Sequence, residues 1–173
     1  MALLEMGTTC SKKYSIIMIV TSEEPNIHWG FLEVKGKNIL DLGCSKFAAS
    51  ISTPEYFIES GADYVVGIDM GDMGWQHPKF KMVCMTITKN SQIQSLLDTY
   101  NPNLIKCDIE GWERTFEEIK ELPNVNEIAI EYHDNSLKLM IERKLIEWGF
   151  GTPDLHQLFD IEIERMGVLH AKK

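Results

Sequence analysis

A short apolar run that ends in an acid and a glycine constrains this chain more than any other feature. Residues 38–45 read Asn-Ile-Leu-Asp-Leu-Gly-Cys-Ser, so Asp41 and Gly43 lie at the end of an extended apolar segment. A buried parallel strand delivers a carboxylate and a tight turn in this way to the carboxyl edge of a sheet, where open α/β sheets bind their ligands. The run therefore predicts a parallel sheet with a ligand site near residues 41–45.

Similar apolar runs recur along the chain and alternate with helical patterns. Thr53-Pro54-Glu55 is typical of a helix N-cap followed by a proline at the first helical position. Alternating strands and helices indicate an α/β fold with a doubly wound, mostly parallel, Rossmann-like sheet in a single domain over residues 1–173. We expect strands at 14–20, 38–42, 63–69, 80–87, 104–109 and 127–132, and helices at 56–60, 91–100, 112–122 and 134–148. A C-terminal antiparallel hairpin over 157–163 and 168–171 should supply an edge of the sheet. Residues 1–12 should form a loose arm.

The composition of the chain limits its expected partners and its expected location in the cell. The chain carries 17 Lys and Arg against 26 Asp and Glu, a formal net charge of -9, and wide contact with nucleic acid needs basic residues to neutralise phosphates. The apolar run 14–20 is far shorter than the ~20 residues of a membrane helix. Four scattered cysteines without metal-ligand spacing indicate reduced thiols. We expect a cytoplasmic protein with no membrane segment and no nucleic-acid partner.

Polar residues at the predicted strand ends form the candidate ligand site. Asp69 ends the second strand of the βαβ unit, where a carboxylate can bind the hydroxyls of a ribose. A dinucleotide would need a GxGxxG turn, and this turn has Gly43 alone, with Ser45 and Lys46 where further glycines would stand. The pattern favours a nucleoside ligand without phosphates, such as S-adenosyl-L-methionine (SAM). The cofactor candidates are Asp41, Gly43, Ser45, Asp69, Met70 and Asp108.

The stretch 104–113, Leu-Ile-Lys-Cys-Asp-Ile-Glu-Gly-Trp-Glu, narrows the assignment. It resembles the lysine and Asp-x-Glu-Gly-x-Glu signature that follows the fourth strand in the FkbM-type family of SAM-dependent methyltransferases, and Glu131-Tyr132-His133 looks like that family's Glu-x-His. The resemblance covers about residues 38–150. It implies a class I methyltransferase that transfers a methyl group to a hydroxyl oxygen of a small molecule or a sugar. The family's DxGANxG turn differs from the Asp-Leu-Gly-Cys-Ser-Lys-Phe found at 41–47.

Methyl transfer needs an in-line approach of the acceptor and a group that takes the acceptor's proton. His133 is the first candidate for this base, with Asp108 and Glu110 as competitors. The clustered acids near this strand edge could also hold a divalent ion, namely Asp108, Glu110, Glu131 and Asp134. Carboxylates are also expected around a sulfonium cation, and we expect no obligatory metal. Trp75 and His77, in the loop after Asp69, could flank the adenine or the acceptor.

Two alternatives stay open. The altered glycine turn is compatible with a non-catalytic binding or assembly protein that keeps the methyltransferase fold, and a nucleotide-dependent oxidoreductase is the second rival. A chain this compact could take its acceptor from an open surface, or complete its site with the partner subunit of a homo-oligomer.

Overall fold

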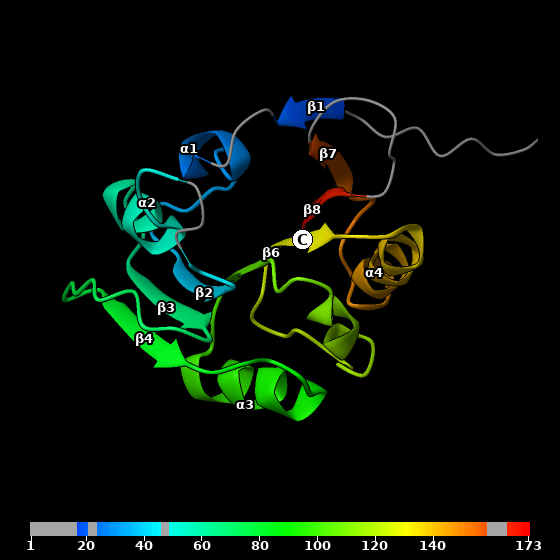
Figure 1. Cartoon of the computed structure of the whole chain (residues 1–173). Helices are drawn as coiled ribbons and strands as arrows, with labels where there is room; N and C mark the ends of the chain where they lie inside the picture. Colours follow the sequence, from blue (N-terminus) through cyan, green and yellow to red (C-terminus); the bar gives the residue numbers. More distant parts are fainter. Residues whose placement is uncertain (1–16, 21–23, 46–48, 159–165) are drawn as a thin grey trace, which may run out of the picture.

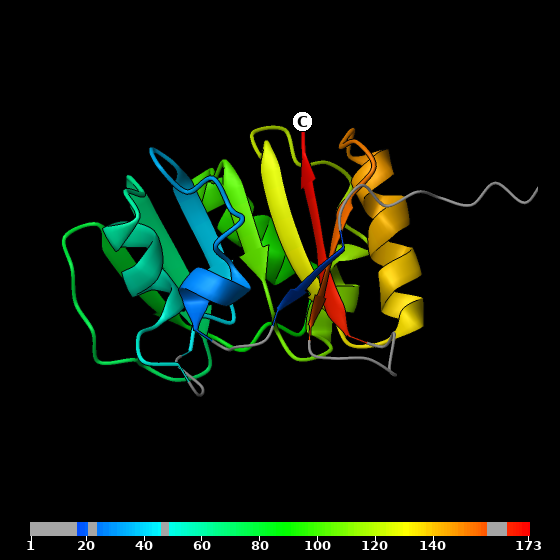
Figure 2. The ribbon, with the colours of Figure 1, turned by 90° about the horizontal axis from the view of Figure 1, so that it is seen from above.

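A computed structural model describes residues 17–20, 24–45, 49–158 and 166–173. These residues form one eight-stranded sheet in the order β1-β7-β8-β6-β5-β2-β3-β4, in which only β8 runs antiparallel to its neighbours (Figures 1 and 2). The expected mostly parallel α/β sheet is therefore confirmed. The strands are β1 Ile17–Val20, β2 Asn38–Leu42, β3 Tyr64–Asp69, β4 Phe80–Cys84, β5 Leu104–Cys107, β6 Glu127–Tyr132, β7 Asp154–Leu158 and β8 Gly167–Lys172.

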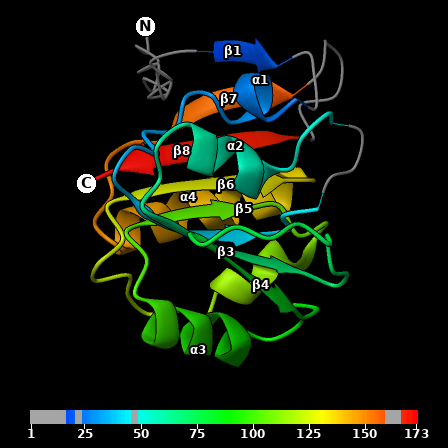
Figure 3. The ribbon, with the colours of Figure 1, turned by 90° about the vertical axis from the view of Figure 1, so that its left-hand side faces the viewer.

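Helices cover both faces of the sheet, with α1 and α2 in front and α4 behind in Figure 3. Successive strand side chains point to opposite faces, so Ile39 packs in a core with Trp29 and Phe57, whereas Leu40 packs in a second core with Phe116 and Ile141. The sheet is thus buried on both sides, as a parallel sheet requires. The helical elements are α1 Pro25–His28, α2 Thr53–Glu59, α3 Asn90–Tyr100, the 3-10 helix η1 Trp112–Phe116 and α4 Asn135–Glu147.

The C-terminal hairpin does not form an edge of the sheet as expected. β8 pairs antiparallel with both β6 and β7, and β1 pairs in parallel with the outer side of β7. The reversed strand β8 is therefore internal, because it lies between β6 and β7, and β1 forms the edge beyond β7. Of the expected strand 14–20, residues 14–16 lie outside the described part of the chain, as do the expected arm at 1–12 and the hairpin residues 159–163.

Three expected elements are shorter in the structure. The helix expected over 112–122 is a 3-10 helix that ends at Phe116, and the Ile119 N–H bonds the Phe116 carbonyl three residues back. The Ile119 carbonyl accepts from the Trp148 indole instead of continuing a helix. β4 and β5 end at Cys84 and Cys107, because the residues that follow them leave the sheet and line a cavity.

No helix within the described ranges is long and apolar enough to cross a membrane.

His156 on β7 makes the stability of the fold depend on pH. Its ring stacks on Phe31 with centroids 3.7 Å apart, it is buried, and neither ring nitrogen has a hydrogen-bond partner among the described residues. Burial, with a smaller contribution from His170, lowers the pKa of His156 to about 4. As the pH falls below the unfolded value of about 6.5, the unfolded chain takes up this proton first, so the folded state loses stability.

We expect acidification from pH 7 to pH 5 to cost up to about 2 kcal/mol through His156. Urea unfolding at a series of pH values measures this cost. His156→Phe keeps a ring against Phe31 and should flatten the slope, whereas His77→Phe, at an exposed position, should leave it unchanged. Equal slopes in the wild type and His156→Phe would show that His156 does not carry the effect.

Candidate active site

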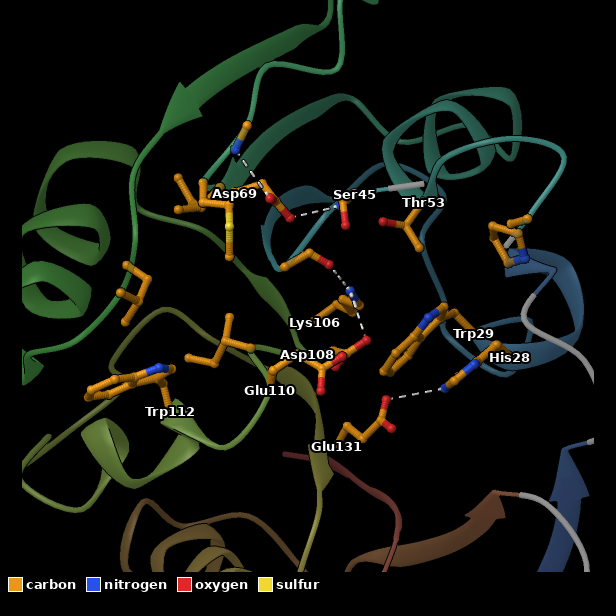
Figure 4. Close-up of a pocket in the computed structure, with 18 of the residues that line it drawn as sticks. His28, Trp29, Ser45, Thr53, Asp69, Lys106, Asp108, Glu110, Trp112 and Glu131 are labelled. Atoms are coloured by element: carbon orange, nitrogen blue, oxygen red, sulfur yellow. Dashed lines mark hydrogen bonds and ion pairs between the residues drawn. The ribbon is translucent and has the colours of Figure 1, made fainter. Parts of the chain in front are cut away.

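A cavity of about 580 Å³ opens at the carboxyl ends of β2, β3, β5 and β6 (Figure 4). Its floor is formed by the strand ends, and one wall comes from α1 and the start of α2. The opposite wall comes from the segments after β4 and β5. Residues from all of these elements line it: Pro25, His28, Trp29, Gly43, Ser45, Ala49, Ile51, Thr53, Ile68, Asp69, Met70, Gly71, Met85, Thr86, Ile87, Lys106, Asp108, Ile109, Glu110, Trp112, Glu131, His133 and Met166.

The cavity brings together most of the residues that the sequence singled out. The residues that line it from that set are Gly43, Ser45, Asp69, Met70, Asp108, Glu110 and His133. Asp41 is not among the lining residues, because its side chain is fully buried between Lys106 and Thr53. Trp75 and His77 are also absent from the lining, since Trp75 packs on His77 and Phe80 instead.

Gly43 makes the turn after β2 possible. Its φ is +74°, and a Cβ atom built on it would lie 1.6 Å from the Asp108 carbonyl oxygen. Only glycine therefore allows the turn after β2 to touch the segment after β5. The chain beyond this turn is placed by Asp69, whose Oδ2 accepts the Ser45 N–H at 3.0 Å. Residues 46–48 of the altered glycine turn lie outside the described part of the chain.

The Asp69 carboxylate, at the end of β3, has more hydrogen-bond acceptor sites than the described residues fill. Its Oδ1 accepts the Gly71 N–H at 3.4 Å, and its Oδ2 accepts the Ser45 N–H, while two carboxylate oxygens together offer about four acceptor sites. Met70 follows directly and is 79% exposed, the largest exposure among the apolar side chains of the described residues. A carboxylate with free acceptor sites thus stands beside an exposed apolar side chain.

Asp41 and Lys106 form a buried ion pair beneath the cavity. The two residues are neighbours in the register of β2 and β5, and Lys106 Nζ lies 3.2 Å from Asp41 Oδ1. The Thr53 hydroxyl donates to the other Asp41 oxygen, and Lys106 Nζ donates to the Gly43 carbonyl. Burial raises the pKa of Asp41. Although burial opposes the charge of Lys106, Asp41 and Asp108 raise the pKa of Lys106, so the ammonium stays protonated at neutral pH.

Asp108 and Glu110 carry the carboxylates of the segment after β5. Asp108 Oδ2 lies 3.9 Å from Lys106 Nζ, and Glu110 is 86% exposed with a φ of +53°, an uncommon conformation for a residue other than glycine. The fully buried Glu113 holds this segment, because its Oε1 accepts the Ile109 N–H at 3.0 Å. Glu113 therefore shapes the cavity edge from within, rather than capping a surface helix.

His133 lies among carboxylates. Its Nδ1 is 3.7 Å from Glu113 Oε1, and its Nε2 is 3.6 Å from Glu110 Oε2 and 3.7 Å from Glu131 Oε1. The interaction with Glu113 is the main cause that raises the pKa of His133 to about 9. At neutral pH the imidazole therefore holds its proton, and it can accept a proton only in the minor fraction of molecules that have lost it.

Sequence reasoning did not place three further residues at the site. His28 and Trp29 come from a stretch expected to be a connecting loop or a short helical turn, and Thr53 comes from an expected helix start. Glu131 Oε2 lies 3.4 Å from His28 Nε2, and burial raises the pKa of Glu131. Of these residues, Trp29 alone could have been singled out from the sequence, because a tryptophan beside a glycine in a polar stretch is unusual for a connecting loop.

Solved structures share this fold. A SAM-dependent methyltransferase from Mesorhizobium loti is 12% identical, with a TM-score of 0.52 over 86% of this chain and 96% of that one. A protein provisionally described as a ribosomal RNA methyltransferase, from Plasmodium falciparum, is 17% identical, with a TM-score of 0.53 over 86% and 91%. A protein provisionally described as a hemolysin, from Lactococcus lactis, is 15% identical, with a TM-score of 0.55 over 82% and 80%.

At these identities the likeness establishes the fold alone, a Rossmann-like α/β fold that this chain shares with SAM-dependent methyltransferases and other proteins. The chain matches no protein-family model and no curated protein.

Proposed function

We propose that this protein is a SAM-dependent methyltransferase. The observation that carries the proposal is the convergence of the Gly43 turn, Asp69 and Asp108 on one cavity at the carboxyl ends of β2, β3 and β5. Its volume of about 580 Å³ lies within the range of pockets that bury a drug-sized ligand. The methyltransferase fold of the neighbouring structures and the FkbM-like stretch at 104–113 support the same assignment.

Each end of the cavity suits one part of SAM. Asp69 has acceptor sites for the ribose hydroxyls, and Met70 offers an apolar surface for the adenine. Asp108 supplies negative charge for the sulfonium and amino groups. Gly43 keeps the first turn close to the Asp108 backbone, so these groups surround one space. SAM itself supplies an activated methyl group.

The proposed acceptor is a hydroxyl oxygen of a small molecule or sugar, as the resemblance to FkbM-type enzymes implies. The acceptor end is the side of the cavity at β6, where Glu131 and His133 lie with Glu110 nearby. The acceptor oxygen attacks the methyl carbon, the carbon–sulfur bond breaks with its electron pair on sulfur, and the hydroxyl proton passes to a site base. Because the pKa of His133 is about 9, Glu131 and Asp108 are the stronger candidates for that base at neutral pH.

A small acceptor is favoured over a nucleic acid by charge. Two of the neighbours are described as RNA methyltransferases, but this chain has a formal net charge of -9, and the cavity carries several carboxylates. Phosphates would be repelled by such a surface. We also propose a cytoplasmic location, because the scattered cysteines without a paired or metal-binding spacing indicate reduced thiols.

Calorimetry with SAM, S-adenosylhomocysteine and NAD distinguishes the alternatives. We expect both SAM and its demethylated product to bind at one site per chain, and NAD not to bind, because the lone Gly43 cannot seat a pyrophosphate. Binding of NAD without SAM would favour the oxidoreductase. Binding of neither at about 1 mM, where a ligand interaction of even 4 kcal/mol would register, would leave only the non-catalytic alternative.

A further inference from the structure

Three ligand-type side chains meet at the acceptor end of the cavity. One potential ligand atom from each of Asp108, Glu110 and His133 lies within 4.8 Å of the corresponding atoms of the other two residues. Figure 4 shows Asp108 and Glu110 next to each other in the cavity. Atoms bound to one ion at 2.0–2.3 Å lie at most about 4.6 Å apart, so a small side-chain movement would place all three around a single cation.

A buried carboxylate orients the His133 ring, and binding of a cation would release the proton from Nε2. A ligating histidine usually gives its second ring nitrogen to a carboxylate, which fixes the ring. Here His133 Nδ1 faces the buried Glu113 Oε1 at 3.7 Å, which leaves Nε2 turned toward Glu110 Oε2 at 3.6 Å. Glu113 is itself held by the Ile109 N–H, so the ring orientation is set by the backbone after β5.

Glu131 adds a further buried carboxylate beside His133. Its side chain is 6% exposed and lines the cavity, and its Oε1 lies 3.7 Å from His133 Nε2. Its Oε2 accepts no hydrogen bond from the described residues and lies 3.4 Å from His28 Nε2. The two oxygens of Glu131 therefore face His28 and His133, and Oε1 would lie near a cation bound at His133 Nε2.

We propose that Asp108, Glu110 and His133 bind a divalent cation that holds the acceptor. This departs from the sequence-based expectation of no obligatory metal. Two carboxylate oxygens and one imidazole nitrogen suit Mn²⁺, since carboxylates favour Mg²⁺, Ca²⁺ and Mn²⁺ and imidazole favours transition ions. Three protein ligands leave positions open for the acceptor.

The cation defines an acceptor class, and this step rests on the proposed function. An acceptor with two neighbouring oxygens, such as a vicinal diol, can bind the ion through both. The ion lowers the pKa of the bound hydroxyl, which loses its proton to a nearby carboxylate or to water. The resulting alkoxide attacks the methyl carbon of SAM, and the carbon–sulfur bond breaks to give S-adenosylhomocysteine. The ion is neither oxidised nor reduced.

Electron paramagnetic resonance of free Mn²⁺ tests the site without SAM. Untagged protein should bind one Mn²⁺ per chain. Glu110→Gln should weaken this binding at least about tenfold, because loss of even an outer partner of a metal ligand has effects of that order. Glu118→Gln is the matched control: it removes the same charge from an exposed residue that does not line the cavity, and it should change binding less than about twofold.

Failure of this proposal is distinguishable from failure of the proposed function. Absence of Mn²⁺ binding at about 1 mM, or equal weakening by Glu110→Gln and Glu118→Gln, would overturn the cation site even if SAM binds. Mn²⁺ binding without SAM binding would support the cation site and contradict the methyltransferase. If both bind, Mn²⁺ should stimulate methyl transfer to a vicinal diol in the wild type only, and no stimulation would overturn the role assigned to the ion.

Discussion

Lys106→Met is expected to lower the free energy of unfolding by about 3–5 kcal/mol, the usual cost of removing one partner from a buried ion pair. Lys106 Nζ lies 3.2 Å from Asp41 Oδ1 and donates to the Gly43 carbonyl, and both side chains are buried. Without the ammonium, the Asp41 carboxylate would keep only the Thr53 hydroxyl. Urea unfolding followed by circular dichroism measures the loss.

Two further variants show whether the unpaired charge is the cause. Lys37→Met removes a lysine just before β2 whose Nζ bonds Asn126 at an exposed position, and it should cost less than about 1 kcal/mol. Adding Asp41→Asn to Lys106→Met should recover part of the loss, because the carboxylate is removed as well. If Lys106→Met costs no more than Lys37→Met, the buried pair does not stabilise the fold as we describe.

Local patterns were sufficient for the parallel sheet. The limits of β2 at Asn38–Leu42 and β6 at Glu127–Tyr132 agree with the predicted ranges, because both are apolar runs closed by turns. The position of β8 could not be predicted, since strand order depends on long-range pairing: β8 reaches both β6 and β7 only in the folded chain. Likewise, the short 3-10 helix after Gly111 depends on Trp148, more than thirty residues away.

The candidate site was predictable where it depends on strand ends. Parallel strands bring Gly43, Asp69 and Asp108 to one edge, and this follows from topology alone. The position of Asp41 was not predictable, because it depends on register: Asp41 lies opposite Lys106, and the pair buries both charges. His28 and Trp29 reach the cavity through packing of α1, which no local pattern specifies.

Asp69→Ala is expected to weaken SAM binding by about 1.5–3 kcal/mol, roughly 10- to 150-fold, because hydrogen bonds to a charged acceptor have this magnitude. The side chain also accepts the Ser45 and Gly71 N–H groups, so its removal loosens the turns on both sides of the ribose position. Asp69→Asn keeps one acceptor oxygen and should fall between the wild type and the alanine variant.

Asp63→Ala is the matched control. Asp63 is an exposed residue just before the first residue of β3, and its replacement by alanine removes the same charge. Unfolding curves for both variants establish that each is folded before binding is compared.

The most direct test of the methyltransferase assignment is therefore calorimetry of SAM with the wild type, Asp69→Ala and Asp63→Ala. The assignment predicts one SAM per chain in the wild type, binding at least about tenfold weaker in Asp69→Ala, and wild-type affinity in Asp63→Ala. Absence of SAM binding by the wild type, or equal affinity in folded Asp69→Ala, would contradict it.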